Sequence, residues 1–169
     1  EYMSDQSSAA ASVDAVIVGA GFSGLYLLHR LRGLGFSTRV FERGSDVGGT
    51  WYWNRYPGAR CDSESHSYCY YFSKELLEEW EWSERYPEQP EIVRYLNYVA
   101  DKLDLKRDIR LGTRVTSARY DEVANLWAVE TEAGDHYTAT YLITAVGCLS
   151  SANVPDIPGL DSFAGDWYH

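Results

Sequence analysis

The chain has 169 residues and a formal net charge of −10, and 45% of its residues are hydrophobic. This length suits one domain, or one domain and part of another, and the hydrophobic content is sufficient for a folded core. The acidic charge argues against nucleic acid as a partner, because phosphate binding needs a basic surface. No apolar run approaches the roughly 20 residues of a membrane span, so we expect no membrane as a partner.

The first stretch of the chain differs in composition from the remainder. Residues 1–12 are mostly polar or small and contain no apolar core of a signal peptide. We interpret them as a flexible lead or a cloning remnant that precedes the folded domain.

A strand followed by a glycine-rich turn is the clearest motif. Val13–Val18 is short, apolar and β-branched, which is typical of a buried parallel strand. The next six residues fit the pattern G-x-G-x-x-G. In this pattern Gly19 permits the tight turn, Gly21 lets the backbone approach a diphosphate, and Gly24 lets the helix lie close to the sheet. A glycine turn without a ligand is the alternative for the bare motif, but its flanking elements favour a dinucleotide site.

A helix and a second strand complete this unit. The helix is expected to end at Gly35, and its apolar residues recur at helical spacing: Leu25, Leu28, Leu31 and Leu34. Its N-terminus offers free N–H groups and a partial positive charge to a diphosphate. Thr38–Phe41 is predicted to be a strand, and Glu42 follows it, 18 residues after Gly24. A carboxylate at this distance accepts hydrogen bonds from ribose hydroxyls.

A segment rich in glycine and aromatic residues comes next. Gly48 and Gly49 suggest a second close approach of the backbone to a ligand. Trp51–Asp62 holds four aromatic residues, two arginines and one aspartate. Neither a period of 2 nor one of 3.6 separates its aromatic residues from its charges, so packing in a core explains it poorly. A loop that stacks rings against a planar ligand is the favoured interpretation.

The middle of the chain is interpreted as packing rather than chemistry. Ser63–Phe72 is predicted to be a strand or an extended segment, and His66 within it is assigned no role. Lys74–Arg85 is predicted to be a short acidic helix with Trp80 or Trp82 turned inward. A clearer helix should run from Pro90 to Leu103. Its predicted inner face is Ile92, Leu96, Val99 and Leu103, and its predicted outer face is Glu91, Arg94, Asn97 and Asp101.

The last third of the chain shows strand patterns. The expected strands are Ile109–Leu111, Thr113–Tyr120, Leu126–Thr131 and Tyr137–Ala145, with a hairpin turn at Gly134-Asp135. Three of them should form a small antiparallel β-meander layer, and the last can return to the parallel sheet. Gly147 breaks this last strand where the carboxyl end of a parallel strand faces a ligand. The fold class is therefore α/β, a Rossmann-like domain with a parallel sheet and an antiparallel layer, incomplete as it stands.

Cysteine usage gives a weaker indication. Cys61, Cys69 and Cys148 are odd in number and match no zinc-ligand spacing. We expect free thiols in a reducing compartment, hence a cytoplasmic protein, and no metal site.

Together these residues resemble the flavin-binding part of type I Baeyer–Villiger monooxygenases, nearest to members that act on phenylacetone, steroids and polycyclic ketones. The likeness is carried by Gly19–Gly24 with Glu42, by the loop Gly48–Asp62 and by the tail Phe163–His169. The tail matches the first seven positions of the family fingerprint F-x-G-x-x-x-H-x-x-x-W-P/D. The loop and the tail are specific, whereas G-x-G-x-x-G is shared by many nucleotide-binding folds.

The resemblance implies FAD and NADPH as cofactors and assigns roles to individual residues. The diphosphate turn and Glu42 would bind the FAD diphosphate and ribose, and Arg60, Cys61 and Asp62 would lie where flavin and nicotinamide meet. Asp62 would position the catalytic arginine, which this chain lacks, and His169 would couple domains. The implied cofactor-binding residues are Gly19, Gly21, Phe22, Ser23, Gly24, Glu42, Arg43, Gly49, Thr50, Trp51, Arg60, Cys61, Asp62, Tyr68, Val115 and Gly147.

The resemblance also implies a division of the chain and a reaction. Residues 13–150 would be the N-terminal part of the FAD-binding domain, and residues 151–169 a linker towards an NADPH-binding domain that this chain lacks. The longer protein would insert one oxygen atom of O2 beside a ketone carbonyl, giving an ester or lactone, with the remainder of its own chain as partner. The 169 residues alone are not expected to turn over substrate.

Three alternatives remain open from the sequence. The first is a related flavin monooxygenase that oxidises nitrogen or sulfur atoms. The second is a non-catalytic module that binds a dinucleotide and regulates a partner. The third is an NAD-binding domain of a dehydrogenase, against which the aromatic loop argues.

Overall fold

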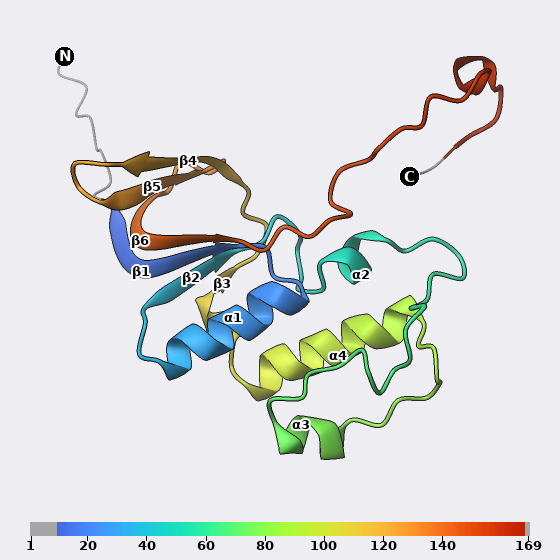
Figure 1. The fold of residues 1–169 in the computed structure, drawn as a ribbon, viewed down its shortest axis with the longest axis horizontal. Coiled ribbons are helices and arrows are strands. Elements are labelled where there is room, and N and C mark those ends of the chain that lie inside the picture. The colour runs from blue at the N-terminus through green and yellow to red at the C-terminus, as the bar shows by residue number, and fades with distance from the viewer. Residues whose placement is uncertain (1–9, 168–169) are drawn as a thin grey trace, which may run out of the picture.

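One six-stranded sheet organises the molecule (Figure 1). The computed structural model describes residues 10–167; residues 1–9 of the predicted lead and His169 of the fingerprint lie outside them. The strands lie in the order β3-β2-β1-β6-β5-β4. They are β1 (Ala11–Val18), β2 (Thr38–Phe41), β3 (Ile109–Arg110), β4 (Val115–Asp121), β5 (Leu126–Thr131) and β6 (His136–Thr144).

The sheet is parallel on one side and antiparallel on the other. β1 pairs in parallel with β2 and with β6, and β2 pairs in parallel with β3, whereas β4, β5 and β6 pair antiparallel. The Rossmann-like α/β class is therefore confirmed. The antiparallel strands continue the parallel sheet through β6, whose first residues pair with both β1 and β5.

The central strand begins earlier than predicted. Ala11 pairs with Tyr137 of β6 and Ser12 with Thr138, so these two residues belong to the sheet and not to a flexible lead. Ala15, Val16 and Ile17 are fully buried. β-branched residues fit this position because β1 is covered on both faces, as central parallel strands are.

The helices cover one side of this sheet (Figure 1). Helix α1 (Phe22–Gly33) is followed by Gly35 at a φ of +86°, a left-handed conformation that glycine adopts readily and that ends the helix near the predicted residue. Helix α4 (Gln89–Lys102) matches its predicted bounds within one residue, but Glu91 does not face outward. Its buried carboxylate accepts hydrogen bonds from the backbone N–H and the hydroxyl of Ser83, both at 2.8 Å. The helices are α1 (Phe22–Gly33), α2 (Thr50–Trp53), α3 (Lys74–Glu79) and α4 (Gln89–Lys102), with 3₁₀ turns at Lys106–Asp108 and Leu160–Ser162.

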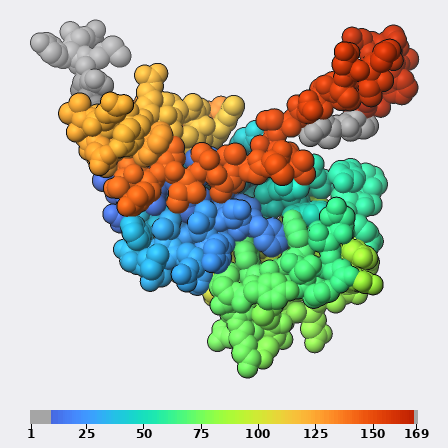
Figure 2. Space-filling model, viewed as in Figure 1, coloured from blue at the N-terminus to red at the C-terminus, as the bar shows by residue number. Residues whose placement is uncertain are grey.

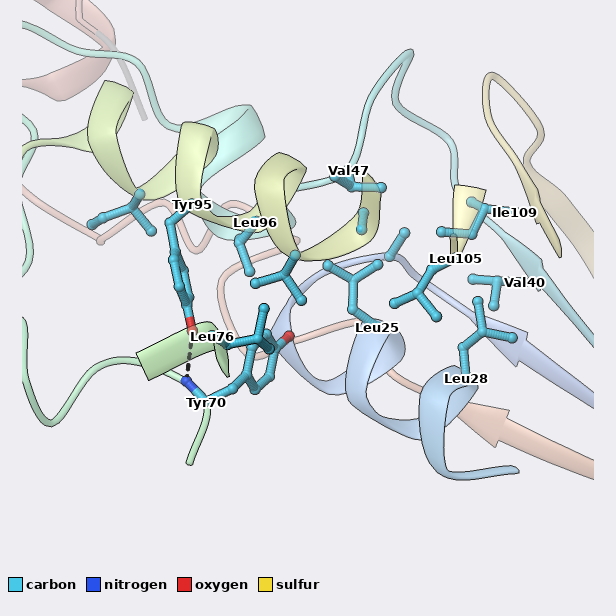
Figure 3. Close-up of a cluster of buried hydrophobic side chains, with 14 of the residues drawn as sticks. Leu25, Leu28, Val40, Val47, Tyr70, Leu76, Tyr95, Leu96, Leu105 and Ile109 are labelled. Carbon is cyan, nitrogen blue, oxygen red and sulfur yellow. Dashed lines mark hydrogen bonds between the residues drawn. The ribbon is translucent and has the colours of Figure 1, made fainter. Parts of the chain in front are cut away.

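The main hydrophobic core lies between the helices and the sheet (Figure 3). Leu25 and Leu28 of α1 and Leu96 of α4 are at most 1% exposed. Burying one such leucine contributes about 2 kcal/mol relative to an exposed position. The hydroxyl of Tyr95 on α4 accepts a hydrogen bond from the backbone N–H of Tyr70 at 2.8 Å, which joins the irregular segment after residue 60 to this core.

A second, smaller core holds the antiparallel strands on the sheet. Its buried members are Val16, Phe41, Val129, Tyr137 and Ala139. The rings of Phe41 and Tyr137 meet edge to face with centroids 5.0 Å apart, a favourable arrangement for aromatic rings. Because these residues come from β1, β2, β5 and β6, the parallel and antiparallel strands share one folding unit.

The segment between α2 and α4 differs most from the sequence prediction. Ser63–Phe72 contains turns and no strand, and the acidic helix ends at Glu79 instead of continuing to Arg85. Long-range contacts hold the segment: the backbone N–H of Ser65 donates to the carbonyl of Arg85 at 2.7 Å, and Arg60 pairs with Glu88. Trp80 and Trp82 both pack against the main core, as was expected of one of them.

The described tail leaves the body of the molecule. Residues 151–167 project from the sheet in an extended path (Figures 1 and 2). Phe163 and Trp167 are 61% and 51% exposed. Of the tail residues that carry the predicted fingerprint, the structure describes those up to Trp167.

Candidate functional site

A cleft of about 510 Å³ opens where three parallel strands end. Val18 of β1, Phe41 of β2 and Thr144 of β6 line it, together with the loops that follow these strands. The carboxyl ends of neighbouring parallel strands form the usual ligand-binding edge of an open α/β sheet. We call this cavity the strand-end cleft.

Glycines allow backbone segments to approach one another at the floor of this cleft. A Cβ atom on Gly21 would lie 3.2 Å from the Cα of Gly49, and one on Gly49 would lie 2.9 Å from the Cα of Gly21. The N–H of Gly48 donates to the carbonyl of Ala20 at 3.0 Å, which fixes the two loops together. The two loops therefore pack backbone against backbone, with no room for a side chain between them.

The other two motif glycines pack the turn against the sheet. Gly19 has a φ of +106°, and a Cβ atom there would lie 2.5 Å from the carbonyl oxygen of Ala145. A Cβ atom on Gly24 would lie 1.9 Å from the carbonyl oxygen of Gly19. Both contacts are shorter than any side chain tolerates, so no other residue fits at either position without a shift of the backbone.

The N-terminus of α1 points its free amides at the cleft. Gly21 is the N-cap, and no side chain caps the helix. The first intrahelical bond is donated by Leu25 to the carbonyl of Gly21 at 3.0 Å. The N–H groups of Phe22, Ser23 and Gly24 therefore have no helical acceptor, and with the helix dipole they form an anion-binding end.

Glu42 places a carboxylate between the two loops. Its side chain is buried and accepts hydrogen bonds from the N–H of Ala20 at 2.8 Å and from the N–H of Gly44 at 2.7 Å. Each oxygen takes one of these bonds and keeps a second acceptor site. The carboxylate thus stabilises both turns and can still accept a bond from a hydroxyl group in the cleft.

Aromatic side chains line the cleft as well. The guanidinium of Arg43 lies 4.5 Å from the ring centroid of Trp53, a cation–π contact. The indole Nε1–H of Trp51 donates to the hydroxyl of Tyr68 at 3.0 Å. Burial raises the pKa of Tyr68, so its phenol stays neutral at physiological pH. Aromatic rings therefore form part of the wall of the cleft, and backbone forms its floor.

Twelve of the sixteen predicted cofactor-binding residues line the strand-end cleft. They are Gly19, Gly21, Phe22, Ser23, Glu42, Arg43, Gly49, Thr50, Trp51, Tyr68, Val115 and Gly147.

The other four predicted residues lie outside the cleft lining. Gly24 is buried behind the turn. Arg60 turns away and bonds to the carboxylates of Glu84 at 2.6 Å and Glu88 at 2.8 Å. Cys61 is buried in the main core, and Asp62 is exposed next to it. The structure therefore does not bring Arg60, Cys61 and Asp62 into the cavity.

Several lining residues were not predicted from the sequence. Asn54 and Trp53 belong to the loop already interpreted as a binding loop, so its aromatic composition was the available signal. Thr113 and Arg114 enter because β3 and β4 lead past the cleft, and Leu149 because the chain turns over it after β6. These contacts depend on topology, for which the sequence gives no local pattern.

Metal ligands and membrane-spanning helices are both absent from residues 10–167. Within that range, no group of three or more histidine, cysteine, aspartate or glutamate side chains is arranged to hold a metal ion. None of the helices described there has the length and apolar character needed to cross a bilayer. The three cysteines are free thiols.

Comparisons with known proteins agree with this geometry. Residues 17–79 match the family model of the NAD(P)-binding Rossmann-like domain. The chain is 50% identical over 157 residues to phenazine N-monooxygenase PhzNO1 of Lysobacter antibioticus, covering 92% of this chain and 29% of that protein. It is 51% identical over 160 residues to a Baeyer–Villiger monooxygenase of Pseudooceanicola batsensis, covering 94% and 29%.

A solved structure extends the comparison to three dimensions. The oxidised steroid monooxygenase bound to NADP is 58% identical, with a TM-score of 0.84 over 92% of this chain and 30% of that one. The chain thus spans about three-tenths of the length of the relatives that it matches. On sequence and fold together, it belongs to the type I Baeyer–Villiger monooxygenases, as their N-terminal, FAD-binding part.

Proposed function

We propose that the strand-end cleft holds FAD in an extended form across the ends of β1, β2 and β6. The observation that carries this proposal is the N-terminus of α1 in the cleft lining, where Gly21 is the N-cap and no side chain caps the helix. A diphosphate needs such free backbone donors, because the N–H groups of α1 must reach its oxygens directly. Glu42 accepts the ribose hydroxyls of the adenosine through its remaining acceptor sites.

The cleft also takes the two ring systems of the cofactor. Arg43 and Val115 line the cleft, and we assign the adenine to them. Trp51, Tyr68 and Gly147 also line it, and we assign the isoalloxazine to them. The neutral phenol of Tyr68 and the indole of Trp51 would exclude water there without placing a charge beside the ring.

We propose for the whole protein an NADPH-dependent oxidation that inserts one atom of O2 beside a ketone carbonyl, giving an ester or lactone. Bound FAD would supply the reduction by NADPH and the activation of O2. The residues of this chain bind the cofactor, orient it and keep water from its ring. Exposed Asp62 remains available to a guanidinium from outside this chain, and in that role it is a positioning residue.

The division of the chain is part of the same proposal. Residues 13–150 would form the first part of the FAD-binding domain, since they hold the sheet and the cleft. Residues 151–169 would be the linker to an NADPH-binding domain, and the projecting path of its described part agrees with this. A cytoplasmic location fits the three free thiols.

Oxidation of a ring nitrogen is a second candidate. The chain is 50% identical to a protein named phenazine N-monooxygenase and 51% identical to one named Baeyer–Villiger monooxygenase. Sequence identity therefore supports this candidate as strongly as the first. This chain forms mainly the cofactor site in our proposal, so the two reactions would share it.

One experiment tests both candidates on the full-length protein that contains this chain. The purified protein should show the absorption bands of oxidised flavin, and NADPH consumption under air should match ester or lactone formed from a bulky cyclic ketone. The same assay with a phenazine gives the comparison. N-oxide formation without ester would select the second candidate, and a protein without flavin would contradict the cofactor assignment.

A further inference from the structure

A second cavity, which shares no lining residue with the strand-end cleft, is lined in part by residues of α3 and α4. Its volume is about 270 Å³. Eight residues line it, and none of them is a lysine or an arginine: His66, Cys69, Tyr71, Leu76, Leu77, Trp80, Trp82 and Tyr95. We call this cavity the aromatic pocket. None of these residues belongs to the FAD site proposed above.

The aromatic rings of this pocket support one another. The centroids of Trp80 and Trp82 lie 5.7 Å apart, edge to face. Both rings also pack on Tyr95, with centroid distances of 5.4 Å and 4.9 Å. Tyr95 is 1% exposed and belongs to the core, so the two tryptophans rest on a rigid base. Tyr71 is 62% exposed and lines the pocket from the solvent side.

The surface beside this pocket is acidic. Between Lys74 and Trp82 the chain carries four glutamates and one lysine. Glu78 pairs with Lys74 at 3.3 Å, and Glu79 pairs with Lys102 at 2.8 Å. Within the described part of the chain Glu75 and Glu81 form no ion pair, and both are exposed; Glu81 stands between Trp80 and Trp82 in the sequence. The segment that carries the two tryptophans is therefore net negative.

We propose that the aromatic pocket binds a small organic cation of the quaternary ammonium class. Aromatic faces attract such a cation through the ring quadrupole, and its weak hydration makes its transfer from water less costly than that of a primary ammonium group. Neighbouring carboxylates add a favourable potential that salt weakens. A neutral ligand of the same shape would gain the apolar contacts but neither electrostatic contribution. The volume suits a molecule of the size of choline.

The test compares choline with 3,3-dimethylbutan-1-ol, in which carbon replaces the charged nitrogen and the shape is kept. Both are titrated into the full-length protein by ligand-observed NMR. We expect choline to bind roughly tenfold more tightly than the alcohol. Equal affinities, or no binding of choline because another part of the full-length chain fills the pocket, would overturn the proposal.

Variants assign the binding to this pocket. Glu81→Gln should weaken choline several-fold and leave the alcohol unchanged, while Glu122→Gln, an exposed glutamate of the β4–β5 turn, should change neither. Trp82→Leu should abolish the preference for choline, and Trp82→Phe should retain part of it, with circular dichroism confirming that each variant is folded. A preference for choline that survives both Glu81→Gln and Trp82→Leu would place the cation elsewhere and contradict the proposal.

Discussion

Residues 11–50 and residues 51–88 build neighbouring parts of one molecule by different means. In the first region regular strands and a helix bring backbone to the ligand edge, and glycines supply the close approach. In the second region side chains join short helices and turns in addition to a few backbone bonds, such as Arg60 with two glutamates and Tyr95 with the N–H of Tyr70. Close contact between backbone atoms leaves no room for an added side chain. A substitution in a network of side chains removes only the interactions of the substituted residue.

The largest effect should come from Gly24→Ala. The added methyl group would meet the carbonyl oxygen of Gly19 at 1.9 Å, and backbone must move to relieve this contact. We expect a loss on the order of 3 kcal/mol in the free energy of unfolding, together with loss of FAD. Denaturant unfolding measures the first and flavin absorbance the second.

Gly33→Ala is the matched control, since it makes the same change in the same helix. A Cβ atom there meets nothing within 4 Å. Alanine should stabilise the helix by about 0.5 kcal/mol. If the two variants were equally stable, close packing of the turn would not be what the glycine motif provides.

Glu42→Ala should have the next largest effect. The variant leaves the buried N–H groups of Ala20 and Gly44 without their acceptor. A loss of about 2 kcal/mol follows from their desolvation, and FAD should bind more weakly because both turns loosen. Thermal unfolding and a flavin titration measure these effects. Exposed Glu132→Ala should be neutral, and a Glu42→Ala protein as stable as that control would refute the role of the carboxylate.

A smaller effect in the second region should depend on pH. Burial raises the pKa of Tyr95 to about 12, whereas a free tyrosine ionises near pH 10. Its stabilising contribution is thus complete below about pH 10 and is lost as the pH rises through about 12. Tyr95→Phe should cost about 1 kcal/mol at pH 7, because the N–H of Tyr70 loses its acceptor.

The same variant should make the decline of stability above pH 10 shallower, as measured by denaturant unfolding at each pH. Tyr120→Phe, which changes an exposed tyrosine on β4, serves as control. A decline of the same steepness in Tyr95→Phe and in the unaltered protein would show that the buried phenol is not responsible.

The smallest effect is expected from Arg60→Met. The guanidinium joins Glu84, Glu88 and the carbonyl of Tyr86, but these groups are exposed, so water and salt screen the interaction. Limited proteolysis between residues 80 and 88 should become faster, most clearly at low ionic strength. Lys74→Met removes an isolated exposed ion pair and should leave the rate of proteolysis unchanged. Equal rates in the two variants would contradict a role of Arg60 in holding this segment in place.

The difference between the regions also explains what the sequence could predict. Thr38–Phe41 and Leu126–Thr131 were predicted with their observed bounds, because apolar periodicity and turn residues mark them. Twelve of the sixteen residues that the glycine pattern and the family resemblance indicated line the cleft. The paired glycines Gly48 and Gly49 indicated a close approach, and Gly49 does meet Gly21.

The predictions that failed depended on contacts between distant residues. Ser63–Phe72 has the composition of a strand, but its backbone N–H groups bond to the carbonyl of Arg85, to local turn carbonyls and to the hydroxyl of Tyr95, so no strand forms. Glu91 was placed outside by helical spacing alone, yet Ser83 offers two donors that make its burial favourable. Neither partner can be identified from local sequence.

The FAD occupancy of full-length Gly21→Ala is the sharpest test of the diphosphate site. The added methyl group would lie 3.2 Å from the Cα of Gly49, so it would press the two loops of the cleft floor apart, but it strains no left-handed backbone. With Gly33→Ala as control, we expect a folded protein by circular dichroism whose FAD dissociation constant rises at least roughly tenfold. A Gly21→Ala protein that retains flavin as tightly as the control would contradict the assignment of the diphosphate to this floor.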